Sequence, residues 1–372
     1  MIQVVEVKTK KQIKDFIEFP LKLYKDNPNF VPPLYMDEKK LFKKNAYLEQ
    51  SETVYYNAYL DGQIVGRISG ILQHTSNEKW QQKRVRFTRF DAIDNQKVAD
   101  SLFQAVEDWA RSKGMEEVVG PLGFTDLERE GLLIEGFEYL STFEEQYNAP
   151  YYQKLIENCG YQKEVDWLEH RIFPPKEIDE RVIKLNERIM ERYHLKLVDC
   201  KNIKQFVKRY GMQFFDILDK TYNNIYGVVP LTDNMKKETI KGFQSLLTMD
   251  YVKAVVDEND QIVSFGITFP GFGSALQKSG GRLTLPTIFR IKKAIKHPKS
   301  IDFGLVGVVD EYRSKGAGAI MFALLLTQLK DTKVEYAETN LNLETNQAII
   351  NQWKSFDHIQ HKRRRSFVKK IN

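Results

Sequence analysis

Apolar and polar residues follow two periods along this chain, and the first is the period of a β-strand. Residues 54–60 and 64–71 are strand-like runs, and Asp61-Gly62 between them is a dipeptide preferred in tight hairpin turns. Residues 84–90 alternate basic with apolar side chains, as a half-buried strand does. The pattern predicts a hairpin followed by a third strand.

The second period is helical. Val98, Leu102, Val106 and Trp109 recur at three- or four-residue spacing, and Gly114 is expected to end the helix that they mark. Shorter patterns predict a strand at 118–119, a helix at 151–158 and a strand at 167–172. The stretch 123–150 between them has no pattern that predicts an element.

The second half of the chain repeats this order. Helices are expected at 175–193, 203–222 and 232–247, a hairpin at 251–256 and 262–269, a strand at 301–309, a helix at 316–330, a strand at 334–340, a helix at 346–355 and a strand at 366–371. Phe173-Pro174-Pro175 is interpreted as a linker, because adjacent prolines continue neither a helix nor a strand. We expect an α/β (α+β) fold of two similar domains, residues 1–173 and 174–372, each with a mixed central sheet flanked by helices.

Composition and charge narrow the class of protein. The chain has 372 residues, 42% of them hydrophobic, and a net charge of +6, which excludes bulk disorder. Two cysteines cannot build a disulfide framework, the N-terminus has no signal-peptide pattern, and no apolar stretch reaches membrane-spanning length. A cytoplasmic protein without a membrane partner is therefore expected.

Basic residues gather in two runs, at 290–299 and 361–370. We interpret the first run as a solvated helix face and the second as an edge strand whose charges discourage pairing. On this interpretation no nucleic-acid partner is expected.

The segment 308–318 has the clearest chemical pattern. An apolar strand enters a loop with basic residues, and Gly316 and Gly318 then open a helix. Backbone N–H groups at a helix N-terminus bind anions, and glycines let a phosphate approach the main chain. Gly304 and Gly307 interrupt the strand, where glycine often marks close approach by a ligand or another backbone. The segment predicts a phosphate-binding loop; the alternative is an ordinary strand–turn–helix with a glycine hinge.

Arg313-x-x-Gly316-x-Gly318 after an apolar strand resembles the acyl-coenzyme A binding motif of the GNAT superfamily of N-acyltransferases. The resemblance covers residues 250–371 well, and the N-terminal half is similar to a second, degenerate unit whose equivalent loop, 91–96, has no glycine. The whole chain resembles bacterial tandem-GNAT proteins of unassigned substrate, with the intact coenzyme A loop in the C-terminal domain. The resemblance implies a coenzyme A site made by Gly307, Val308, Val309, Arg313, Ser314, Lys315, Gly316, Ala317, Gly318, Ala319, Asn346 and Trp353.

The resemblance also implies direct attack of an amine on the thioester, with the Val308 N–H facing the thioester oxygen. A primary amine is mostly protonated at pH 7, and removing its proton costs roughly 4–5 kcal/mol. Glu338 is the candidate catalytic base, with Asp302 and Glu344 behind it. Many members of the family place a Tyr seven residues after the helix Asn to protonate the leaving thiolate, but Trp353 stands there in this chain. The acid is therefore absent, supplied elsewhere or unnecessary.

The expected activity is transfer of an acyl group, with acetyl favoured, from acetyl-coenzyme A or another acyl-coenzyme A to a primary amine of a small molecule or peptide. Two alternatives stay open: an acyl-coenzyme A-binding protein without catalysis, and a Fem-like aminoacyl-transferase, against which the coenzyme A loop argues. No metal site is expected, because His358 and His361 have no recognisable third ligand. The sequence leaves the oligomeric state open.

Overall fold

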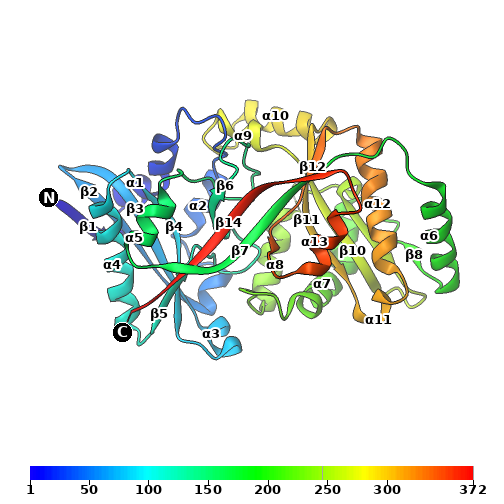
Figure 1. Cartoon of the computed structure of the whole chain (residues 1–372), viewed down its shortest axis with the longest axis horizontal. Coiled ribbons are helices and arrows are strands. Elements are labelled where there is room, and N and C mark those ends of the chain that lie inside the picture. The colour runs from blue at the N-terminus through cyan, green and yellow to red at the C-terminus, as the bar shows by residue number, and fades with distance from the viewer. Residues whose placement is uncertain (245, 372) are drawn as a thin grey trace.

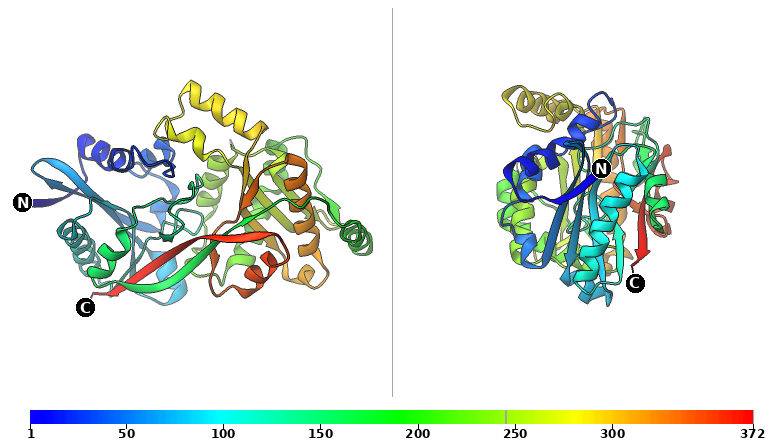
Figure 2. Two further views of the ribbon diagram at one scale, coloured as in Figure 1. Left: turned by 45° about the horizontal axis from the view of Figure 1, so that its top comes forward. Right: turned by 90° about the vertical axis from the view of Figure 1, so that its left-hand side faces the viewer.

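The computed structural model describes residues 1–244 and 246–371, and its strands form one 14-stranded mixed sheet (Figure 1). The main path is β1-β2-β3-β4-β5-β14-β7-β12-β11-β10-β9-β8, with β6 beside β14 and β13 beside β7. Helices flank this sheet in both halves of the molecule (Figure 2). The predicted fold class, a mixed sheet flanked by helices, is confirmed.

The N-terminal half begins with the predicted hairpin. Asp61 and Gly62 both have positive φ, at 50° and 78°, which the tight turn between β2 and β3 requires. The elements of this half are β1 (Ile2–Glu6), α1 (Lys10–Leu23), α2 (Tyr35–Lys40), the 3-10 helix η1 (Ala46–Glu49), β2 (Ser51–Leu60), β3 (Gln63–Gln73), α3 (His74–Trp80), β4 (Arg84–Ala92), α4 (Gln96–Ser112), β5 (Glu117–Gly120), β6 (Leu132–Glu135), α5 (Tyr152–Asn158) and β7 (Gln162–Ile172).

The C-terminal half repeats the order hairpin, strand, helix, strand, helix, strand after additional helices. Its elements are α6 (Glu180–Arg192), β8 (Lys196–Leu197), α7 (Ile203–Tyr222), α8 (Asp233–Phe243), η2 (Met249–Tyr251), β9 (Val252–Val256), β10 (Ile262–Pro270), α9 (Gly273–Gln277), α10 (Leu285–Lys296), β11 (Ser300–Val308), α11 (Asp310–Arg313), α12 (Ala317–Thr332), β12 (Tyr336–Glu338), β13 (Asn342–Leu343), α13 (Gln347–Trp353) and β14 (His358–Lys370).

The core of the C-terminal half has two layers, one on each face of the sheet. Along β9, Val252 and Ala254 join the apolar cluster of α7, whereas Val255 joins the cluster of α12. Successive side chains of a strand point to opposite faces, so α7 and α12 cover opposite faces of the sheet.

The two halves exchange their last strands. β7 closes the first half of the sequence but pairs with β12 of the second, and β14 closes the second half but pairs with β5 of the first. β7 and β14 also pair with each other, and they run side by side through the centre of Figure 1. The division into domains at residue 173 stays a prediction, and in the sheet the halves are joined by this exchange.

The exchange overturns the expectation of an edge strand at 361–370. β14 is an internal strand with partners on both sides, and it begins earlier than the predicted 366–371. Its basic side chains Lys362 and Arg364 are buried against carboxylates, so their charge serves internal ion pairs. The sequence pattern missed this because the strands that pair with β14, β7 and β5, lie about 190 to 250 residues earlier in the chain.

Within the described ranges, no helix combines the length and apolarity needed to cross a membrane.

Candidate active site

The candidate site lies where β11 and β12 separate. The strands pair in parallel from Ser300↔Tyr336 to Asp302↔Glu338, and beyond this point β11 has an open edge. This edge borders a cavity of about 370 Å³. Five of the residues predicted to bind coenzyme A line the cavity: Gly307, Val308, Arg313, Asn346 and Trp353.

The open edge of β11 carries backbone groups that face the cavity. The Val309 N–H donates to Val263 O on β10 at 2.9 Å. Successive residues of a strand direct their N–H groups to opposite sides, so the Val308 N–H points to the open edge. This is the direction expected for an N–H that faces a thioester oxygen.

Side chains contact the same edge. The Tyr222 hydroxyl at the end of α7 donates to Val306 O at 3.1 Å and lies 3.4 Å from Val306 N, from which it accepts. The Arg313 Nε donates to Val308 O at 3.3 Å. Burial raises the pKa of Tyr222 to about 12, so its hydroxyl keeps its proton. Sequence reasoning missed Tyr222, because no motif marks the last residue of a helix so far upstream.

The loop after β11 has the form that an anion site needs. Gly316 has a φ of 86° and starts α12, whose first N–H groups, at Ala317 and Gly318, precede any intrahelical acceptor. A Cβ built on Gly318 would have Val308 Cγ2 as its nearest neighbour, at 3.9 Å, so space lies beside that backbone. The residues present therefore fit a phosphate. Of the predicted segment 313–319, Arg313 lines the cavity, whereas Ser314 to Ala319 form the loop and first helical turn that follow it.

The glycines inside β11 have a packing cause. A Cβ on Gly304 would lie 2.7 Å from the Phe269 ring, and a Cβ on Gly307 would lie 2.5 Å from the Phe265 ring. Both rings belong to β10, the neighbouring strand. Packing against these rings explains both glycines without a ligand. They are therefore weaker evidence for a binding site than the sequence alone suggests.

Asn346 and Trp353 both belong to the wall of the cavity. Asn346 is the N-cap of α13 and accepts from the Ile349 N–H at 3.4 Å. Trp353 is 4% exposed, and its Nε1 donates to Asn342 Oδ1 at 2.7 Å. The indole is held in place and presents no acidic proton to the cavity.

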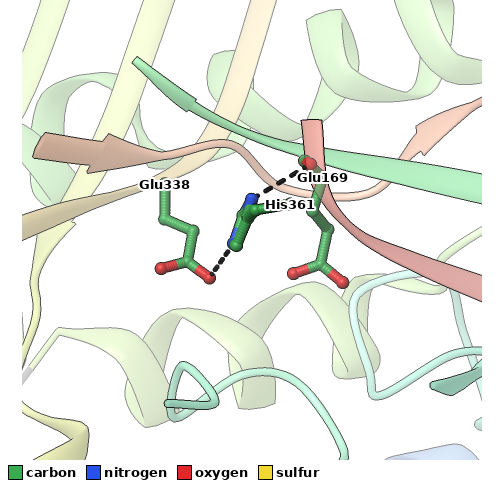
Figure 3. A group of neighbouring side chains, drawn as sticks. All are labelled: Glu169, Glu338 and His361. Carbon is green, nitrogen blue, oxygen red and sulfur yellow. Dashed lines mark hydrogen bonds and ion pairs between the residues drawn. The ribbon is translucent and has the colours of Figure 1, made fainter. Parts of the chain in front are cut away.

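Glu338 lies outside the wall of the cavity, in a buried ionic cluster (Figure 3). The His361 Nε2 lies 2.7 Å from its Oε1, and the Lys362 ammonium contacts the same oxygen. Burial alone would raise the pKa of Glu338, but the charge of Lys362 and the hydrogen bond from His361 outweigh it and lower the pKa to about 2. A carboxylate this acidic is a weak base, so these ion pairs count against the predicted role of Glu338, which remains untested.

The same cluster brings together three residues of types that can bind a metal ion. Ligand atoms of Glu169, Glu338 and His361 all lie within 4.8 Å of one another. Lys362 Nζ contacts Glu338 and lies 3.6 Å from Glu169 Oε2, so an ammonium already supplies the positive charge. The geometry is that of a structural ion-pair network.

The stretch 123–150, for which the sequence predicted no element, supplies a set of acidic groups to the cavity. Burial raises the pKa of each of these carboxyls, that of Glu145 to about 7. The only signal in the sequence is the density of acidic residues in this stretch. The carboxyls are those of Asp126, Glu128, Glu130, Glu144 and Glu145.

No family model matches the chain. Two curated proteins match nearly its whole length. Protein YghO of Escherichia coli (strain K12) is 28% identical over 378 residues, which cover 97% of this chain and 94% of that protein. A protein named bacterial ceramide synthase, from Caulobacter vibrioides (strain NA1000 / CB15N), is 24% identical over 363 residues, which cover 94% of this chain and 92% of that protein.

Two solved structures similar to this chain are named as GNAT or GCN5-related proteins. A tandem GNAT protein from the clavulanic acid biosynthesis pathway superposes with a TM-score of 0.59 at 12% identity and covers 100% of this chain and 99% of its own. A GCN5-related N-acetyltransferase from Sphaerobacter thermophilus has a TM-score of 0.51 at 12% identity, with 100% and 96% covered. The predicted resemblance to tandem GNAT proteins is confirmed at the level of the fold.

Proposed function

Because the chain has the tandem GNAT fold, we propose that it is an N-acyltransferase that moves an acyl group from coenzyme A to a primary amine. The observation that carries the proposal is the open edge of β11, which borders a cavity and leads into the glycine-started helix α12. Such an edge offers backbone N–H and C=O groups to an extended chain, and the helix N-terminus offers N–H groups to phosphates.

The residues predicted to form the coenzyme A loop keep their proposed roles in this assignment. Arg313, Ser314 and Lys315 supply charge and hydrogen bonds to the phosphates, and the first turn of α12, residues 316–319, supplies N–H groups. The Val308 N–H stabilises the negative charge that develops on the thioester oxygen. Asn346 and Trp353 form the wall beside β11.

Acetyl is the acyl group expected from the sequence, and the cavity favours a second candidate with a longer chain. Aromatic and aliphatic side chains of α7 and α8 make much of its lining, among them Phe206, Phe214, Phe215, Ile240 and Phe243. One relative is named a ceramide synthase, and a ceramide is an amide of a long-chain amino alcohol. Both points support a hydrocarbon chain on the acyl group or on the amine.

Binding and turnover measured on the full chain test the proposal. Acetyl-coenzyme A and palmitoyl-coenzyme A are compared by thermal shift, and release of free coenzyme A thiol is then followed with an added long-chain amine. Stabilisation by either thioester with amine-dependent thiol release is the expected result. Stabilisation without thiol release for any amine would favour the non-catalytic alternative, and no stabilisation would reject the coenzyme A site.

A further inference from the structure

We propose that Glu130, Glu144 and Glu145 form a binding site for the ammonium group of the acceptor, and that Glu145 takes a proton from it. This inference rests on the proposed function and assigns the acceptor a chemical class: a primary alkylamine with a hydrocarbon body. Glu130 lies between β5 and β6, and Glu144 and Glu145 lie between β6 and α5. All three belong to the N-terminal half, whereas β11 belongs to the C-terminal half.

The placement of the three carboxylates supports the proposal. All three line the cavity that the open edge of β11 also lines. Glu130 is 4% exposed and Glu145 is 6% exposed. An amine held by them would therefore lie in the same cavity as Val308.

The hydrogen bonding of these groups is incomplete. Within residues 1–244 and 246–371, neither Glu130 Oε1 nor Glu145 Oε2 has a hydrogen-bond partner, although both atoms are buried. A buried carboxylate oxygen without a donor costs free energy, and an ammonium group carries three donors. A cationic ligand would supply the hydrogen-bond donors that these oxygens lack.

Glu145 stands apart from Glu130 and Glu144 in its surroundings. Arg364 Nε lies 3.6 Å from its Oε2, which partly offsets the burial that raises the pKa of this carboxyl to about 7. The pKa values of Glu130 and Glu144 are raised well above the usual range by burial. A base whose pKa lies near the operating pH is the most effective, which favours Glu145. The charged groups that face Glu145 are Arg364 and Lys362 of β14, Glu169 of β7, Asp302 of β11, Arg129 and Glu130 before β6, and Glu144 of its own loop.

The rest of the cavity wall defines the other end of the ligand. α7 and α8 contribute Ile203, Phe206, Val207, Phe214, Phe215, Ile240 and Phe243. These side chains offer no charge and no strong hydrogen-bonding group, so this part of the wall fits a hydrocarbon chain. A ligand with one ammonium group and a hydrocarbon chain fits both the carboxyl groups and the apolar side chains of the wall.

The reaction balances with these groups. The ammonium nitrogen gives one proton to the Glu145 carboxylate and becomes a free amine. The amine nitrogen bonds to the thioester carbon, the carbon–sulfur bond breaks, and the sulfur leaves with the electron pair. The nitrogen loses a second proton to the sulfur, which gives an amide and a free thiol, while Glu145 returns its proton to water.

The test compares two probes with the same hydrocarbon chain, the cationic octylamine and the neutral octanol, by calorimetric titration of the full chain. Octylamine is expected to bind at least about tenfold more tightly than octanol, and more tightly as the pH rises through about 7, because the carboxylate ionises while the amine stays protonated. Glu130→Gln and Glu145→Gln should bring octylamine down to the affinity of octanol. Glu138→Gln, an exposed glutamate of the loop that holds Glu145, is the matched control and should bind octylamine as the unaltered chain does.

Turnover separates a base from a binding residue. With octylamine at saturation, Glu145→Gln should lower kcat by about 10²–10⁴ while coenzyme A affinity is unchanged. Equal affinity for octylamine and octanol, or unchanged octylamine affinity in both variants, would overturn the proposal; if Glu145→Gln does not fold, Glu130→Gln decides alone. Loss of coenzyme A binding with octylamine binding intact would reject the proposed function and leave the ammonium site standing.

Discussion

At the scale of single residues, the surroundings of a carboxyl decide its chemistry more than its place in a motif. Glu338 sits where the family resemblance implies a base, yet Lys362 and His361 hold it as a buried anion. Glu145 has no motif, yet burial gives it the proton affinity that a base needs. The two residues therefore call for separate tests.

Glu338→Gln should lower the free energy of unfolding by about 3–5 kcal/mol at pH 7, because Lys362 would stay buried without the carboxylate nearest to it. Because the pKa of Glu338 in the folded chain is lowered to about 2, this stability is present at neutral pH and is lost as the pH falls from the usual glutamate range towards 2. Urea unfolding measures the effect, with the exposed Glu335→Gln as its control. Full stability with a 10²–10⁴-fold loss of turnover would instead support the catalytic role predicted from the sequence.

Gly318→Asp should weaken coenzyme A binding at least about tenfold without lowering Tm. The site has room for the side chain, and a fixed carboxylate at the start of α12 would repel a phosphate. Gly316→Asp is a poorer test, because φ at Gly316 is 86° and a Cβ there would lie 2.8 Å from Ile189 Cδ1. Calorimetric titration with coenzyme A measures the effect, and Gly318→Ala is the control. Normal coenzyme A affinity in Gly318→Asp would show that the start of α12 does not bind a phosphate.

At the scale of elements, Tyr222 occupies the edge of β11 that a bound pantetheine chain would use. Its hydroxyl meets both backbone groups of Val306, in the way that an added strand would. The end of α7 therefore satisfies the open edge in the free protein and has to give way to a ligand.

Tyr222→Phe should tighten coenzyme A binding by about two- to tenfold, because the ligand no longer displaces a hydroxyl that contributes about 0.5–1.5 kcal/mol. The prediction is tested by comparing the dissociation constant of coenzyme A between the variant and the unaltered chain. Weaker binding would mean that the hydroxyl contacts the ligand directly. A loss of turnover with normal binding would identify Tyr222 as the acid that Trp353 does not supply.

The elements themselves were largely predictable from local pattern. The helix predicted at 203–222 is α7 with the same bounds, and the turn at Asp61-Gly62 forms as expected. The segment 123–150 was not predictable, because contacts with a distant strand hold its backbone in place. The Lys362 ammonium donates to Leu140 O at 3.1 Å, and Arg364 donates to Gln146 O. Contacts between residues so far apart leave no periodic pattern in the sequence from which they could be predicted.

At the scale of the whole molecule, the exchange of last strands makes the two halves one cooperative structure. Phe367 of β14 comes from the C-terminal end of the chain but is fully buried in the core of the N-terminal half, with Phe87 and Phe103. Damage to this strand therefore removes support from both ends of the sheet.

Phe367→Ala should lower the stability of the full chain by about 3–5 kcal/mol while leaving a single unfolding transition. The space left by the missing phenyl ring lies in the N-terminal half. The C-terminal half nevertheless loses the support of β14 when the N-terminal half unfolds. Differential scanning calorimetry of the variant and the unaltered chain tests this. Two separated transitions in either protein would show that the halves unfold independently.

The exchange of strands also has a consequence during synthesis. β5 ends at Gly120 and its partner β14 begins at His358, 238 residues later in the chain. At about 5–20 residues per second, the ribosome needs roughly 12–50 s to make that interval. For this time the N-terminal half emerges with β5 exposed as an unpaired edge, and the short length of that strand, four residues, limits the edge that other nascent chains could join.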